Sequence, residues 1–193
     1  MQENYTRLTG IVLTSTPLKE NSCVFTLFTK ELGIVSCFAH GLSSKNLRKR
    51  VLTTPLSYGS YELKKKKGAF HLHDGSSLSL IPKNEFANVT LVGSLLRYIK
   101  KTQLEQKPAP ALFDLLIYYV KKCSSMGNVQ AMHASFLLKL MKHEGMYHET
   151  QPLPSMTAEE NNLAKQLAEI RSFESLEQIS VENSLIEKLA LLI

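Results

Sequence analysis

The chain has 193 residues, 44% of them hydrophobic, and a formal net charge of +6. This length allows one large domain or two small ones with a real hydrophobic core. The three cysteines include no C-x-x-C pair, which excludes a disulfide framework and a four-cysteine zinc site. The polar N-terminus and the lack of an apolar run of about 18 residues predict no signal peptide and no membrane span, and hence a cytoplasmic protein.

The charge is distributed unevenly along the chain. Residues 1–82 carry eleven Lys or Arg against five Asp or Glu, which gives +6. Residues 83–150 carry nine against five, or +4, and residues 151–193 carry three against seven, or −4. A basic front half favours a polyanionic partner such as nucleic acid.

The first 82 residues contain short runs rich in β-branched and aromatic side chains, which are typical of strands. We predict strands over residues 8–14, 23–29, 34–40, 55–64 and 69–73, with residues 77–81 continuing or rejoining the sheet. Turns are predicted at 15–22, 30–33 and 64–68, and a loop at 41–50. Turns spaced roughly 8–12 residues apart indicate a small closed barrel. A five-stranded OB-like barrel is the best candidate, and an SH3-like barrel is the alternative.

After Pro82 the apolar residues recur at helical spacing. Helices are predicted from Asn84, which is a candidate N-cap, and over residues 111–123 and 129–143. A capping-box pattern, Thr157 to Glu160, begins another helix, a short helical turn follows at 175–180, and a last helix covers 181–193. The sequence therefore predicts an α+β protein with a barrel domain over 1–82 and an all-α domain over 83–193.

Two groups of basic residues lie at predicted turns of the barrel. The first, here called the basic segment, consists of Lys45, Arg48, Lys49 and Arg50. The second, here called the lysine tip, consists of Lys64, Lys65, Lys66 and Lys67. Few acids lie nearby, and side chains of this kind contact the phosphates of nucleic acids. We predict that these eight residues bind DNA; the alternative for the first group is a solvated loop without a role.

Aromatic residues alternate with the basic ones along the predicted strands. They are Phe25, Phe28, Tyr58, Tyr61 and Phe70. An aromatic ring on the open face of the barrel would stack on unpaired bases, whereas one on the inner face would fill the core. Tyr58 and Tyr61 have opposite parity, so at most one of them faces a binding groove.

The sequence offers little for catalysis or metal binding. His71 and His73 lie on one strand face, but only Asp74 is near as a third ligand. His143 and His148 have no Cys or acid partner at ligand spacing. The sequence contains no G-x-S-x-G, no P-loop and no G-x-G-x-x-G. We therefore predict no enzyme activity, no metal and no cofactor.

Four stretches together resemble the bacterial RecO family. They are G-I-V-L (10–13), T-L-F-T-K-E-L-G (26–33), A-H-G-L-S-S-K (39–45) and P-A-P-A-L-F-D-L-L (108–116). The resemblance implies an N-terminal OB-fold, a helical domain, and a recombination mediator that binds single- and double-stranded DNA and anneals complementary strands. It further implies binding of RecR and of the tail of single-stranded-DNA-binding protein, loading of RecA, and a nucleoid-associated place in the cytoplasm.

Two features depart from the family pattern. Many members carry a four-cysteine zinc module after the third helix, whereas here E-G-M-Y (144–147) stands at that point and no cysteine follows. We therefore expect a shortened form without the zinc module. His40, Leu42 and Ser43 stand where the family has more basic residues, and the charge reappears at 45–50. A protein-interaction adaptor and an RNA-binding OB protein are the alternative functions.

Overall fold

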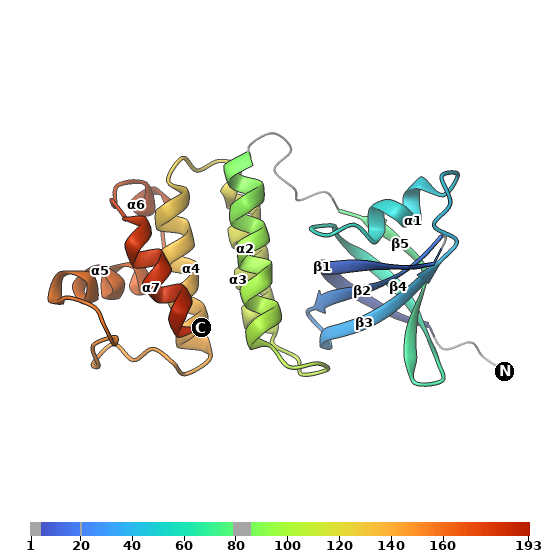
Figure 1. Cartoon of the computed structure of the whole chain (residues 1–193), viewed down its shortest axis with the longest axis horizontal. Coiled ribbons are helices and arrows are strands. Elements are labelled where there is room, and N and C mark those ends of the chain that lie inside the picture. The colour runs from blue at the N-terminus through green and yellow to red at the C-terminus, as the bar shows by residue number, and fades with distance from the viewer. Residues whose placement is uncertain (1–4, 20, 79–85) are drawn as a thin grey trace. The chain divides into compact units, whose positions relative to one another are not determined.

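A computed structural model describes residues 5–19, 21–78 and 86–193 (Figure 1). These residues form five strands followed, apart from one helix between β3 and β4, by six helices. The strands are β1 Tyr5–Lys19, β2 Ser22–Thr29, β3 Gly33–His40, β4 Tyr58–Lys66 and β5 Ala69–Ser77. The helices are α1 Leu47–Leu52, α2 Phe86–Thr102, α3 Pro110–Cys123, α4 Val129–His143, α5 Ala158–Glu169, α6 Phe173–Glu177 and α7 Asn183–Leu192.

The five strands close into a barrel in the order β1-β2-β3-β5-β4, with β4 paired back to β1. The β3–β5 pair is parallel and the other pairs are antiparallel. Helix α1 lies between β3 and β4 in the chain (Figure 1). The predicted α+β class and the OB-like barrel are thus confirmed. The barrel closes through a short β3–β5 ladder of two residue pairs, Cys37 with Phe70 and Phe38 with His71.

Alternation along the strands fills the barrel interior. In β2, Cys23, Phe25 and Leu27 point inward, and each is at most 4% exposed. Leu52, at the end of α1, belongs to the same core, although it comes from outside the sheet. The Tyr61 hydroxyl donates to the carbonyl oxygens of Leu52 at 3.1 Å and of Ser57 at 3.2 Å, and so holds α1 to the barrel.

The structure differs from the predicted boundaries mainly at connections. Residues 47–50 of the predicted loop are helical, because the Asn46 side chain caps α1 by accepting from the Lys49 N–H and buried Leu52 anchors the helix. Strand β1 extends to Lys19 and β2 begins at Ser22, so that most of the predicted turn at 15–22 is strand. Pro17 is tolerated there beside a register shift in the ladder. Residues 79–85, including predicted N-cap Asn84, lie outside the described residues.

The chain divides into two compact units. The first contains residues 1–81 and 103–115, and the second contains 82–102 and 116–193. The connection after α2 and the start of α3 pack on the barrel. The Gln106 N–H donates to the Ile34 carbonyl at 2.8 Å, and the Phe113 ring lies 5.5 Å from that of Phe28. The division at residue 82 stays a prediction, while the contacts place residues 103–115 with the barrel.

The second unit is built around α4, which packs against α2, α5 and α7. A buried polar network joins its helices: Tyr119 Oη lies 2.9 Å from Ser135 Oγ, and Ser135 Oγ donates to the Leu167 carbonyl at 2.8 Å. The predicted capping box at Thr157 and Glu160 is present at the start of α5. No helix within the described ranges is long and apolar enough to cross a membrane.

Candidate nucleic-acid interface

The basic segment lies on and just before α1, which has local hydrogen bonds at both ends. Asn46 caps the start of the helix, and the Thr53 hydroxyl donates to the Lys49 and Arg50 carbonyls at 3.1 Å after its end. Lys45, Arg48 and Arg50 are exposed and Lys49 is half-buried. Charges that were predicted on a loop are therefore presented by a helical turn with a fixed backbone.

Arg48 is engaged by the barrel more than its three basic neighbours. Its Nε and Nη2 atoms donate to the Gly75 carbonyl at 3.0 and 2.6 Å, and Nη2 lies 3.5 Å from Asp74 Oδ1. The guanidinium therefore ties α1 to β5 and shares its charge with a carboxylate. A phosphate contact by Arg48 would have to compete with these partners.

Arg50 borders a groove of about 690 Å³ between the β1–β2 hairpin and the segment around α1. The polar lining of this groove consists of Ser15, Asn21, Ser22, Ser44, Arg50, Thr53 and Thr54. Hydroxyls around one guanidinium match the donors that bind phosphate oxygens in protein–DNA interfaces. No local sequence pattern indicates this groove, since its lining comes from three separate stretches.

The lysine tip is the hairpin that joins β4 to β5. Lys67 and Gly68 both have positive φ, 48° and 85°, as a two-residue turn of type I′ requires. Lys65 Nζ lies 5.6 Å from the centroid of the Phe70 ring and Lys64 Nζ lies 5.7 Å from that of Tyr5, within cation–π range. Lys65, Lys66 and Lys67 are exposed.

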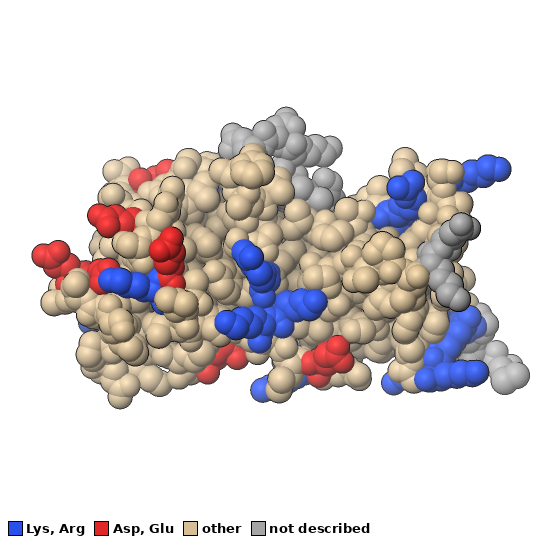
Figure 2. Space-filling view, in the orientation of Figure 1, with Lys and Arg blue, Asp and Glu red and all other residues tan. Residues whose placement is uncertain are grey.

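The two basic groups do not form one patch. Helix α1 precedes the first residue of β4, Tyr58, and the lysine tip lies at its last residue, Lys66. Arg48 contacts Gly75, which pairs with Tyr61 of β4, and the five residues from Tyr61 to Lys66, at about 3.3 Å each, span about 16 Å along the strand. On the face drawn in Figure 2, Lys and Arg side chains likewise stand in separate groups. A ligand bound by both groups must be long.

Most of the predicted aromatic candidates fill the core. Phe25, Phe28 and Tyr61 are 0% exposed and Phe70 is 9% exposed, so none of the four offers an open face to a base. Tyr58 is half-buried and its ring lies 6.5 Å from that of Phe113. The core alternative therefore holds for Phe25, Tyr61 and Phe70, which alternation turns into the barrel. Phe28 has the opposite parity and is buried under Phe113 instead.

Another set of rings lies on the outside of the barrel and was missed from the sequence. The strand register aligns one residue from each strand in a row across the sheet, here called the outer row. It consists of Val24, Phe38, His71, Lys64 and Tyr5. Phe38 could have been recognised by parity, because its neighbours Cys37 and Ala39 are both 0% exposed. The alignment with His71 depends on the parallel β3–β5 pairing, which no local pattern reveals.

Rings in and beside the outer row stack on one another. The Phe38 and His71 rings lie 5.3 Å apart at 23°, and the His40 and His71 rings 5.7 Å apart at 22°. The Tyr5 ring lies 4.6 Å from that of His73. Burial, with His40 and Lys66 nearby, lowers the pKa of His71, which favours the neutral ring at neutral pH. In the described part of the chain, no three metal-binding side chains form a group that could hold an ion.

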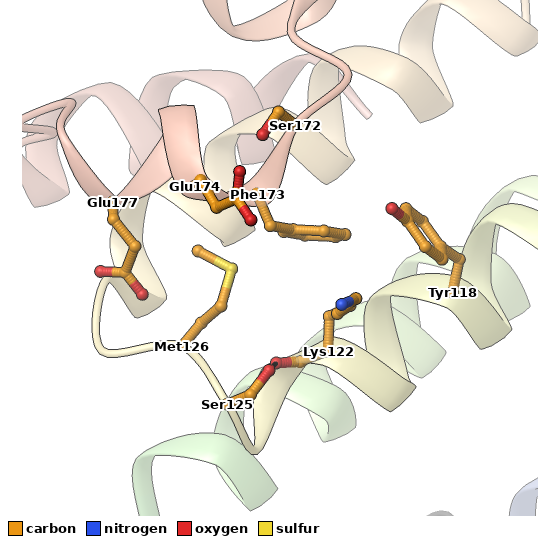
Figure 3. A pocket seen from close by; sticks show the side chains of 8 residues that line it. All are labelled: Tyr118, Lys122, Ser125, Met126, Ser172, Phe173, Glu174 and Glu177. Atoms are coloured by element: carbon orange, nitrogen blue, oxygen red, sulfur yellow. Dashed lines mark hydrogen bonds between the residues drawn. The ribbon is translucent and has the colours of Figure 1, made fainter.

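The helical unit contains a smaller pocket of about 310 Å³ between α3 and α6. Figure 3 shows the Phe173 ring and the Met126 side chain across it, with Tyr118 and Lys122 on the α3 side. Its two carboxylates come from α6. The Glu177 carboxylate accepts from the Gly127 N–H at 2.8 Å, and the second carboxylate belongs to Glu174. This pocket combines an apolar floor with one ammonium group.

Comparison with known proteins gives consistent matches. Residues 1–81 match the model of a family described as "Recombination protein O N terminal". The chain is 30% identical over 142 residues to "DNA repair protein RecO" of Chlamydia pneumoniae, and this match covers 72% of the chain and 56% of that relative. It is 26% identical over 146 residues to the protein of that name from Bacillus subtilis, covering 75% and 57%. The match thus spans little more than half the length of these relatives.

Proposed function

Because this chain belongs to the RecO family, we propose that it is a DNA repair and recombination mediator that binds single- and double-stranded DNA and anneals complementary strands. The observation that carries the proposal is an OB-like barrel with exposed basic groups on α1 and at the hairpin between β4 and β5. In this proposal the protein is not an enzyme: it acts by binding and aligning DNA strands in the cytoplasm, at the nucleoid.

Phosphate contacts supply the affinity in this proposal. Lys45, Lys49 and Arg50 would bind the backbone at the α1 end, where the hydroxyls of the groove add hydrogen bonds. The lysine tip would bind it at the other end, and Arg48 would chiefly position α1. Contacts to the backbone carry no sequence information, so the same surface serves both complementary strands, as annealing requires.

Partner binding is the second part of the proposal: RecR, and the acidic tail of single-stranded-DNA-binding protein, would bind this protein while RecA is loaded. The pocket between α3 and α6 suits such a tail, since Lys122 offers a cation beside the Phe173 and Met126 side chains (Figure 3). Glu174 acts against it. Lys122→Gln should therefore weaken tail binding and Glu174→Gln should strengthen it. Equal effects of the two changes would contradict this site.

Strand annealing tests the proposal directly. Two complementary oligonucleotides, one with a fluorophore and the other with a quencher, are mixed with the protein at about 50 and 200 mM salt, between which phosphate-driven binding weakens steeply. We expect faster annealing than without protein at low salt and a loss of the effect at high salt. A protein that binds neither strand at low salt would overturn the proposal.

The two alternative functions, an interaction adaptor and an RNA-binding protein, are distinguished by what each would bind. An interaction adaptor would bind single-stranded-DNA-binding protein through its tail but would not shift a bare oligonucleotide. An RNA-binding OB protein would prefer RNA when DNA and RNA oligonucleotides of equal length compete. A preference for DNA together with annealing distinguishes the mediator from both.

A further inference from the structure

The outer row is the least explained surface of the barrel. Phe38 and His71 are half-buried rings that stack on each other, and exposed His40 extends the stack. Each lies on the outside of a strand whose adjacent residues fill the core, so none of these rings is needed to pack the interior. Stacked rings on an outer sheet face are the feature on which unpaired bases bind.

Charge around these rings matches a polyanion. Lys64 belongs to the row itself, and Lys65 and Lys66 follow it on β4. The nearby carboxylates already have partners: Glu62 Oε2 lies 3.6 Å from Arg7 Nη2, and Glu105 Oε1 accepts from Ser36 Oγ at 3.1 Å. A strand whose phosphates follow the lysine tip would therefore bring its bases toward the rings.

We infer that Phe38, His71 and His40 form a base-stacking surface that gives this protein preferential affinity for single-stranded over double-stranded DNA. The inference rests on the proposed DNA binding and adds the basis of its selectivity. The bases of a duplex are stacked and paired with each other, so their faces are closed to protein rings. Phosphates are available in both forms, and the lysine tip would bind both.

The role of the imidazoles is to provide ring surface rather than charge. His71 is favoured in its neutral form, and His40 Nδ1 lies 3.1 Å from Ser22 Oγ, which orients its ring parallel to that of His71. Replacing His71 by another aromatic residue should therefore preserve binding, whereas removing the ring should not.

Fluorescence anisotropy with a labelled thymine oligonucleotide and a duplex of equal length tests this selectivity. For Phe38→Ala and His71→Ala we expect single-strand affinity to fall by roughly tenfold for each ring, as the loss of a base–aromatic stack predicts, with duplex affinity unchanged. His71→Phe should keep single-strand affinity. Lys65→Ala with Lys66→Ala should weaken binding to both forms.

His148→Ala is the matched control, because it removes an exposed imidazole from the helical unit. Melting curves followed by circular dichroism establish that each variant is folded, and surface variant His71→Ala decides the result if Phe38→Ala unfolds. Equal losses on single strands and duplex, or no loss on either, would overturn the stacking surface while leaving DNA binding intact. A wild-type protein that binds neither form would instead overturn the proposed function.

Discussion

At the scale of single residues, Gly33 illustrates how one position meets two requirements. It ends the hairpin between β2 and β3 with φ at 70°, where side chains cost about 1–2 kcal/mol. A Cβ there would also lie 2.0 Å from the Lys107 carbonyl oxygen. The turn needs the conformation, and the returning chain needs the space.

Gly33→Ala should therefore destabilise the protein more than Gly41→Ala does. Gly41 has a similar φ of 73°, but a Cβ there would meet nothing within 4 Å, so it isolates the cost of the conformation. Urea unfolding of both variants measures the difference. Equal losses of unfolding free energy would show that residue 107 moves aside without cost.

His133 is a second informative residue, on α4. Burial and the nearby Arg97 lower its pKa to about 4, and its Nε2 atom has no hydrogen-bond partner among the described residues. The unfolded chain, with the ordinary pKa of 6.5, takes up a proton at higher pH than the folded one does. This residue therefore stabilises the fold above pH 6.5, and the contribution is lost as the pH falls toward 4.

His133→Leu should remove this part of the acid sensitivity. A pKa difference of about 2.5 corresponds to about 3 kcal/mol at most. The difference in unfolding free energy between wild type and variant should therefore change by up to that amount between pH 7 and pH 4. Thermal melts at several pH values measure it, with His148→Ala as the control. A difference in stability between wild type and variant that stays constant across this pH range would contradict the prediction.

At the scale of elements, α1 is too short to be stable alone and depends on the barrel. Leu52 is 0% exposed in the barrel core, while its neighbour Val51 is 42% exposed. The basic segment is thus presented by a helix whose position is set by one buried side chain and by the Arg48 tether.

Leu52→Ala should cost about 2–5 kcal/mol of unfolding free energy and also weaken DNA binding, because α1 loses its anchor. Val51→Ala is the matched control and should change neither by a comparable amount. Denaturant melts and anisotropy measure the two effects. A normal DNA affinity in folded Leu52→Ala protein would separate the position of α1 from binding.

At the scale of the whole molecule, the basic groups act from separate places on the barrel. Each phosphate contact with a single strand contributes about 0.7 to the slope of log affinity against log salt. Lys49→Ala with Arg50→Ala should therefore lower the slope by about 1.4, and Lys66→Ala with Lys67→Ala by the same amount. Because the two pairs lie on separate elements, α1 and the β4–β5 hairpin, the four changes together should lower it by about 2.8.

Arg48→Ala is the internal control for this additivity, since its guanidinium already binds Gly75 and Asp74. It should change the slope less than either pair does per residue. Titration of a long thymine oligonucleotide at a series of salt concentrations measures all four proteins. A combined slope equal to that of one pair alone would show that only one basic group contacts DNA.

The fold could largely be predicted from the sequence, and the candidate site only in part. Helix α4 begins and ends at the predicted residues, because its bounds follow from local periodicity. The basic residues were evident from composition. Helix α1 was missed because its stability comes from burial of Leu52 in a barrel built from distant strands.

The sequence by itself determined the strand and helix content, the basic front half and the family, since periodicity, charge and motifs are properties of neighbouring residues. Only the tertiary structure decided which side chains meet. It placed the basic segment and the lysine tip on separate elements, buried four predicted aromatic candidates, and aligned Phe38 with His71 instead. The physical reason is that closure of the barrel pairs β3 with β5 in parallel, and this register joins residues that are far apart in the chain.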